Sequence, residues 1–168
     1  MRESLYILLP PMLAISAYTE VKSRRIPNWL TLGGMLAALS VSFLLGGFDA
    51  FKSSSIGMVV GAGVFLPFCI AGVLGGGDFK LMGAVGAVVG FPDVLWVLYY
   101  TVLSGGIIAL GYAIWKGRLL TTLSDLFRII LGRKRNKSEG LRNVPTVPYG
   151  IAIAAGTLWA LVMIMSRG

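Results

Sequence analysis

The chain has 168 residues, of which 56% are hydrophobic and 13% charged, with a formal net charge of +8. Globular proteins carry about a quarter charged residues, so a water-soluble domain of this size would lack the polar surface it needs. Intrinsic disorder is excluded because it requires low hydrophobicity. The composition predicts a membrane protein with one domain, residues 1–168, and we attribute its basic charge to membrane topology rather than to nucleic acid.

Apolar runs follow one another along the chain, and we expect each to be a membrane-spanning helix. About 20 helical residues cross a hydrocarbon core of about 30 Å, so two of the runs, the first and the fourth, are short. Pro92-Asp93 fits a tight turn that separates the fourth run from the fifth. The six runs are Leu5–Thr19, Trp29–Gly47, Ile56–Leu74, Phe79–Phe91, Val94–Trp115 and Tyr149–Met165.

Basic residues are distributed unequally between the two sides of such a six-span protein. Of the 15 lysines and arginines, 12 fall in or beside the loops 20–28, 75–78 and 116–148, and only Arg2, Lys52 and Arg167 fall on the other side. The positive-inside rule therefore places these loops in the cytoplasm and both termini outside. No cleaved signal peptide is expected, because the first run does not end in a small-x-small site.

Two further patterns concern packing and the last loop. Leucine, isoleucine and phenylalanine recur at helical spacing over 119–131, which predicts an amphipathic helix on the cytoplasmic interface. The basic stretch that follows it reads as a linker near anionic lipid. The GxxxG pairs Gly57/Gly61, Gly72/Gly76 and Gly86/Gly90 are interpreted as helix-packing positions.

The residue types present limit the chemistry. There is no histidine, and Cys69 is the single cysteine, so Ser/His triads, disulfides and paired-cysteine metal sites are excluded. We expect no metal and no cofactor. Catalysis, if any, would use carboxylates, lysines or hydroxyls.

Two acids, Glu20 and Asp78, stand at the cytoplasmic ends of the two short spans, below the membrane surface. Ionisable groups at such depth usually line a polar cavity. Two neighbouring carboxyls that share one proton can perform aspartic-protease chemistry without histidine or metal. Simpler interpretations remain open: Glu20 as a boundary acid paired with nearby basic residues, and Asp78 as a helix N-cap.

Three motifs resemble those of the type IV prepilin peptidases, which are polytopic aspartic proteases. Gly75–Leu81 resembles the GxGD-x-K-L motif, and Glu20–Thr31 resembles the segment in which an acid precedes a basic run and an Ile-Pro-Asn step. Val147–Gly150 is similar to the Pro-aromatic-Gly step that opens the last helix of the family. The motifs occur in the family's order and cover essentially the whole chain.

The resemblance implies that Asp78 and Glu20 are the two catalytic acids, although the family has aspartate where this chain has Glu20. An extra methylene displaces the carboxyl by about a bond length, and a misplacement of about 1 Å can cost about a hundredfold in rate. Lys80 either tunes this pair or serves only membrane orientation. The residues implied to bind substrate or shape the site are Gly75, Gly77, Lys80, Pro27, Asn28, Pro148 and Gly150.

The implied function is removal of a short basic leader from prepilin-like precursors at the cytoplasmic side of the cytoplasmic membrane. The short format resembles the peptidases of tight-adherence (Flp) pili. A methyltransferase activity is not indicated, because the chain lacks the extra region with paired cysteines. The alternative is a non-catalytic relative that acts as a pilus-assembly scaffold, which Glu20 favours; a small transporter is a third, weaker reading.

Overall fold

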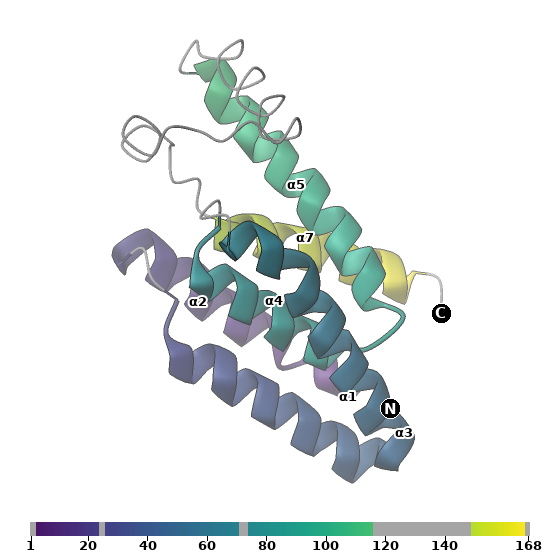
Figure 1. Cartoon of the computed structure of the whole chain (residues 1–168). Helices are drawn as coiled ribbons and strands as arrows, with labels where there is room; N and C mark the ends of the chain where they lie inside the picture. The colour runs from purple at the N-terminus through teal and green to yellow at the C-terminus, as the bar shows by residue number, and fades with distance from the viewer. Residues whose placement is uncertain (1–2, 24–25, 71–73, 116–148, 167–168) are drawn as a thin grey trace. The chain divides into compact units, whose positions relative to one another are not determined.

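The computed structural model describes residues 3–23, 26–70, 74–115 and 149–166, which form helices joined by turns, with no strand among them (Figure 1). The all-α prediction is confirmed. The chain divides into two compact units, residues 1–104 with 148–168 and residues 105–147. Every contact described below lies within the first unit. The predicted interfacial helix over 119–131 lies outside the described residues.

The first apolar run was expected to form one continuous helix, but it does not. It divides into α1 (Glu3–Tyr6) and α2 (Leu9–Ser23). Pro10 and Pro11 explain the restart, because proline suits the first helical turn, where its missing N–H needs no partner. At its other end α2 continues past the apolar run, so Glu20 lies in a helix rather than in the predicted loop.

The second and third apolar runs are joined in α3 (Asn28–Ile70), whose helical geometry is interrupted at Gly47, with φ 65° and ψ −156°. Glycine adopts this backbone conformation without steric cost, and the chain turns back there. A hydrogen bond of 2.7 Å between the buried hydroxyls of Ser42 and Ser54 joins the two arms. The segment between the runs, expected to be a loop, is therefore largely helical.

The predicted turn at Pro92-Asp93 is confirmed, since α4 (Gly76–Val89) and α5 (Val94–Trp115) are separate helices. Gly90 ends α4 with φ 75°, and its amide donates to the carbonyl of Gly86 at 2.8 Å. The turn is tied to the second arm of α3: the Phe91 amide donates to the Ser53 carbonyl at 3.0 Å, and the Ser53 hydroxyl donates back to the Phe91 carbonyl at 2.6 Å.

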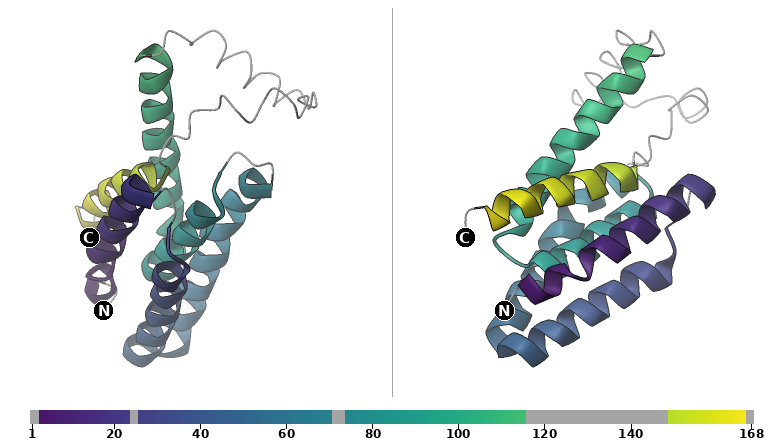
Figure 2. Two further views of the ribbon diagram at one scale, coloured as in Figure 1. Left: turned by 90° about the vertical axis from the view of Figure 1, so that its left-hand side faces the viewer. Right: turned by 180° about the vertical axis from the view of Figure 1, so that it is seen from behind.

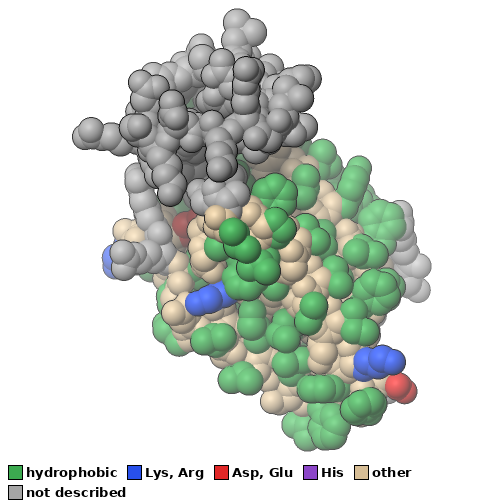
Figure 3. All heavy atoms as spheres, viewed as in Figure 1, with side chains coloured by type: hydrophobic (Ala, Val, Ile, Leu, Met, Phe, Trp, Pro, Cys, Tyr) green, Lys and Arg blue, Asp and Glu red, His purple; other side chains and the backbone are tan. Residues whose placement is uncertain are grey.

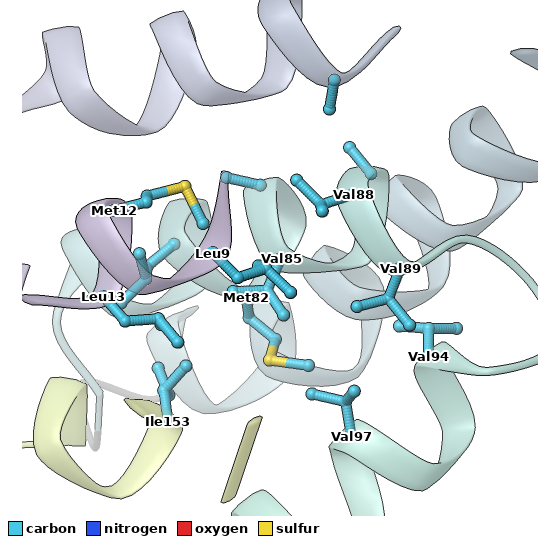
Figure 4. Close-up of a cluster of buried hydrophobic side chains, with 14 of the residues drawn as sticks. Leu9, Met12, Leu13, Met82, Val85, Val88, Val89, Val94, Val97 and Ile153 are labelled. Carbon is cyan, nitrogen blue, oxygen red and sulfur yellow. The ribbon is translucent and has the colours of Figure 1, made fainter. Parts of the chain in front are cut away.

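Helix α4 is the centre of the core. Every residue from Leu81 to Val89 is buried, and α4 contacts α1, α2, α3 and α7. Its valines and Met82 meet side chains of α2, α5 and α7, among them Leu9 and Ile153 (Figure 4). A helix that is apolar on all sides is stable only when it is surrounded. This explains why the fourth run is both short and uniformly apolar.

Two of the three GxxxG pairs pack as predicted; in the third, a Cβ on Gly76 would meet nothing within 4 Å, and Gly72 lies outside the described residues. Gly57 lies against the backbone of Gly86 and Gly90, and a Cβ on Gly61 would stand 2.6 Å from the carbonyl oxygen of Met82. The second arm of α3 and α4 therefore touch backbone to backbone, which side chains at these positions would prevent.

The last helix, α7 (Tyr149–Met165), lies alongside α2 (Figure 2). Polar and aromatic contacts fix it against the first part of α5. The Ser104 hydroxyl donates to the carbonyl of Ala152 at 2.9 Å, and the rings of Tyr100 and Trp159 stack with centroids 5.5 Å apart. Consequently the amino end of α7 is held near the carboxyl end of α2.

Large apolar side chains cover much of the described surface, and charged groups are sparse on the face shown in Figure 3. Phe48 is 71% exposed and Ile70 79% exposed, values typical of a surface that faces lipid or a partner. Among the described helices, α3 alone is long and apolar enough to cross a membrane by itself, while Val94–Ile108 and Tyr149–Met165 are apolar but shorter. The six-span topology therefore stays a prediction.

Candidate active site

Four segments that are distant in sequence meet at one end of the first unit. They are the last turns of α2, residues 26–28 before and at the start of α3, the Gly75–Asp78 turn, and the first turn of α7. The Gly47 turn of α3 and the Phe91 turn lie at the opposite ends of their helices. Glu20 and Asp78, predicted to lie on one side of the membrane, are both in this end of the unit.

Glu20 is half-buried, and its Oε2 atom is fully buried without a hydrogen-bond partner. The carboxylate lies against Gly150 in α7. Burial raises the pKa of Glu20, which stands just beyond the predicted first span, while the backbone amides of Gly150 and Ile151 act in the opposite direction. The amino end of α7 thus faces the carboxylate and favours its charged form.

The interpretation of Glu20 as an ion-paired boundary acid finds no support from Lys22. That side chain turns to Tyr18 instead, with Nζ 3.5 Å from the hydroxyl and 5.6 Å from the ring centroid. The other proposed partners, Arg24 and Arg25, lie outside the described residues.

Asp78 is 7% exposed and occupies the first turn of α4. The N-cap residue of α4 is Gly75, and Asp78 lies three residues further on. The interpretation of Asp78 as the N-cap is therefore wrong. The carboxylate nevertheless reaches back to the cap: the Gly75 amide donates to Asp78 Oδ2 at 3.2 Å, and the Asp78 amide donates to the Gly75 carbonyl at 3.1 Å. This hydrogen bond orients one carboxylate oxygen and leaves the other for chemistry.

The two acids lie close enough to interact electrostatically. Burial raises the pKa of Asp78, which precedes the predicted fourth span, and the negative charge of Glu20 raises it further, to about 6. The charge of Glu20 thus disfavours ionisation of Asp78, as in a pair in which one carboxyl is ionised and the other protonated.

Two of the glycines before Asp78, Gly75 and Gly77, are in close contact with neighbouring atoms, and neither has a positive φ. Gly75 has φ −72° and ψ 148°, an extended conformation open to any residue. Instead, a Cβ on Gly77 would stand 3.0 Å from Cβ of Ile26, and a Cβ on Gly75 would stand 3.2 Å from Asp78 Oδ2. The turn therefore presses closely against its neighbours.

Ile26, which the sequence analysis included only as part of the Ile-Pro-Asn step and not as a site residue, also belongs to this site. It is partly buried against the core, and its side chain reaches from Gly77 to Gly150. It therefore links the segment carrying Asp78 to the helix against which Glu20 rests. The available signal was an isolated apolar residue at the end of a polar, basic stretch.

Lys80, Pro27 and Asn28 connect α4 to α3. Lys80 Nζ donates to Asn28 Oδ1 at 3.0 Å, so Lys80 is hydrogen-bonded to this amide. The Pro27 carbonyl accepts the amide of Leu30 at 3.2 Å, and α3 begins at Asn28, one residue before the second apolar run. Pro148 lies outside the described residues.

The arrangement has the parts that acid–base hydrolysis needs: two interacting carboxyls, one held by a backbone amide and the other against a helix amino end. Within the described residues, no three metal-ligating side chains gather in one place.

Comparison with known proteins gives one match. The family model described as the type IV leader peptidase family matches residues 7–110, a range that contains Glu20, Asp78 and the segments around them. No curated protein and no solved structure matches the chain.

Proposed function

Because the chain belongs to the type IV leader peptidase family, we propose that it is an aspartic endopeptidase that removes the short basic leader from type IV prepilin-like precursors. The observation that carries this proposal is the electrostatic contact between Glu20 and Asp78. The carboxyls come from different helices, at the positions where the family motifs have their two acids.

The surroundings of the two acids suggest a role for each. The amides at the start of α7 favour the charged form of Glu20, whose charge in turn favours the protonated form of Asp78. Glu20 accordingly acts as general base and takes a proton from the attacking water. Asp78 donates its proton as the carbonyl oxygen becomes negative and the amine leaves, and proton transfer between the carboxyls restores the pair.

The depth of the site supports cleavage within the membrane region. Helix α4 has 14 residues and is therefore about 21 Å long, shorter than a hydrocarbon core of about 30 Å. If the far end of α4, at Gly90, lies at the outer boundary of the hydrocarbon core, α4 is too short for Asp78 to reach the cytoplasmic boundary of the core. The basic loops favour an orientation with this end of the protein toward the cytoplasm and both termini outside.

The direct test is Asp78→Asn. Asparagine keeps the shape and can still accept the Gly75 hydrogen bond, but it cannot transfer a proton. We expect purified Asp78→Asn to lose leader cleavage of a prepilin-like substrate while remaining folded. Asp49→Asn, which changes an exposed acid in α3 near the Gly47 turn, is the matched control and should cleave like the parent. Cleavage by Asp78→Asn at the parental rate would disprove the mechanism.

A second candidate function is a non-catalytic scaffold that binds pilins. It is favoured by Glu20, which departs from the family aspartate. Binding of the precursor by the parent protein without removal of its leader would support this alternative.

A further inference from the structure

We propose that Gly150, the second residue of α7, is a positioning residue whose missing side chain leaves the space in which the longer arm of Glu20 places its carboxylate. This inference rests on the proposed function of Glu20. If a Cβ were added to Gly150, it would overlap Glu20 Oε2 and stand 3.2 Å from Glu20 Cδ and 3.6 Å from Ile26 Cδ1. The carboxylate therefore occupies the volume of the absent side chain.

The backbone gives no other reason for glycine at this position. Gly150 lies within the first turn of α7 and is not among the glycines with positive φ. Alanine would suit a helix better, by about 0.5–1 kcal/mol. The contact with Glu20 is what excludes it.

Of the two partners of this contact, helix α7 has no room to withdraw, whereas the carboxylate ends a flexible, half-buried side chain. Ile26 fills the neighbouring side, and it is itself in close contact with Gly77. Helix α7 is held by the hydrogen bond from Ser104 to Ala152 and by the backbone contact of Gly156 with Thr101. A methyl group on Gly150 would therefore displace the carboxylate rather than the helix.

The contact explains how this chain accommodates glutamate where its family has aspartate. An aspartate at position 20 has a shorter arm and would leave the space beside Gly150 vacant. The effect of a methyl group on Gly150 must then depend on which acid occupies position 20.

The test is a cycle of four purified proteins: the parent, Gly150→Ala, Glu20→Asp, and the double variant. Kinetics of leader cleavage are measured on one prepilin-like substrate, and thermal unfolding is measured in detergent. Gly33→Ala is the control, because a Cβ on this exposed helical glycine meets nothing within 4 Å.

We expect Gly150→Ala to lower kcat about a hundredfold, with little change in KM, because the carboxylate is displaced by about 1 Å. The double variant should cleave at the rate of Glu20→Asp, and Gly150→Ala should lower the unfolding temperature only when position 20 is glutamate. Gly33→Ala should match the parent in both measurements.

The inference would be overturned if Gly150→Ala cleaved at the parental rate. It would also be overturned if Glu20→Asp were active but the double variant were as inactive as Gly150→Ala. A parent that does not cleave would instead refute the proposed function. In that case the unfolding temperatures still test the contact. If Gly150→Ala lowers the unfolding temperature only with glutamate at position 20, the contact is supported. If the effects of the two substitutions on the unfolding temperature are additive, the contact is absent.

Discussion

At the scale of single residues, the two acids of the site lower the free energy of unfolding, because folding places their carboxyls where charge is poorly solvated. Glu20 Oε2 is buried without a hydrogen-bond partner, and the Asp78 carboxylate accepts a hydrogen bond from the Gly75 amide. Buried polar groups left without partners are unfavourable for folding. Two acids with raised pKa values at one place are typical of functional sites.

The acid at position 20 should act together with Asp78 as a unit. We expect Glu20→Gln to be as inactive in leader cleavage as Asp78→Asn, because each removes one ionisable carboxyl of the pair. Glu20→Asp should retain or raise activity, since it restores the acid found in the family. Comparing single-turnover rates of the three variants tests this. Parental cleavage by Glu20→Gln would make Glu20 a boundary acid and refute the two-carboxylate mechanism.

The pKa of Asp78 also predicts how stability depends on pH. Its folded-state pKa, about 6, is raised above the ordinary value, so folding favours the protonated form. The protonated form of Asp78 therefore stabilises the fold at low pH, and this stabilisation, on the order of 2 kcal/mol, is lost as pH rises from about 4 to about 6. The unfolding temperature of the parent should fall over this interval and level off above it, and that of Asp78→Asn should fall less. Equal pH dependence of the two proteins would contradict the burial of a titrating Asp78.

At the scale of helices, close backbone contact positions the segment that carries Asp78. Gly57 and Gly61 in α3 let α4 approach until backbones touch, and α4 then presents Asp78 at its first turn. The hydrogen bond from Lys80 to Asn28 joins the same two helices at the site. The glycine pairs thus support the site from within the core.

Gly57→Ala should consequently destabilise the protein. The added methyl meets backbone atoms of Gly86 and Gly90, which cannot rotate away, so we expect a loss of about 1–3 kcal/mol. Gly63 lies in the same arm of α3 and is exposed, and a Cβ added there would meet nothing within 4 Å. The control Gly63→Ala should therefore be neutral or slightly stabilising. Unfolding temperatures in detergent compare the two variants, and equal effects would contradict the close packing of α3 on α4.

At the scale of the whole molecule, the sequence predicted the helices better than it predicted their contacts. Apolar runs bounded by glycine, proline and charge located most helices, and two of the three predicted helix-packing pairs are confirmed. The errors arose where local signals compete: α2 continues through Glu20, and α3 stays helical through Lys52 despite its polar neighbours. The contact of Gly150 with Glu20 was not predictable, because it depends on how distant helices pack.

The predicted orientation in the membrane can be tested with cysteines at the two ends of the first unit. Lys22 is exposed near the site, and Asp49 is exposed just after the Gly47 turn of α3. With Cys69 replaced by alanine, Asp49→Cys should react with a membrane-impermeant thiol reagent in intact cells, whereas Lys22→Cys should not. Both should react after lysis. The basic loops near the site are the reason, because translocating them is unfavourable. Labelling of Lys22→Cys but not Asp49→Cys in intact cells would place both acids on the outer side and exclude cleavage from the cytoplasm.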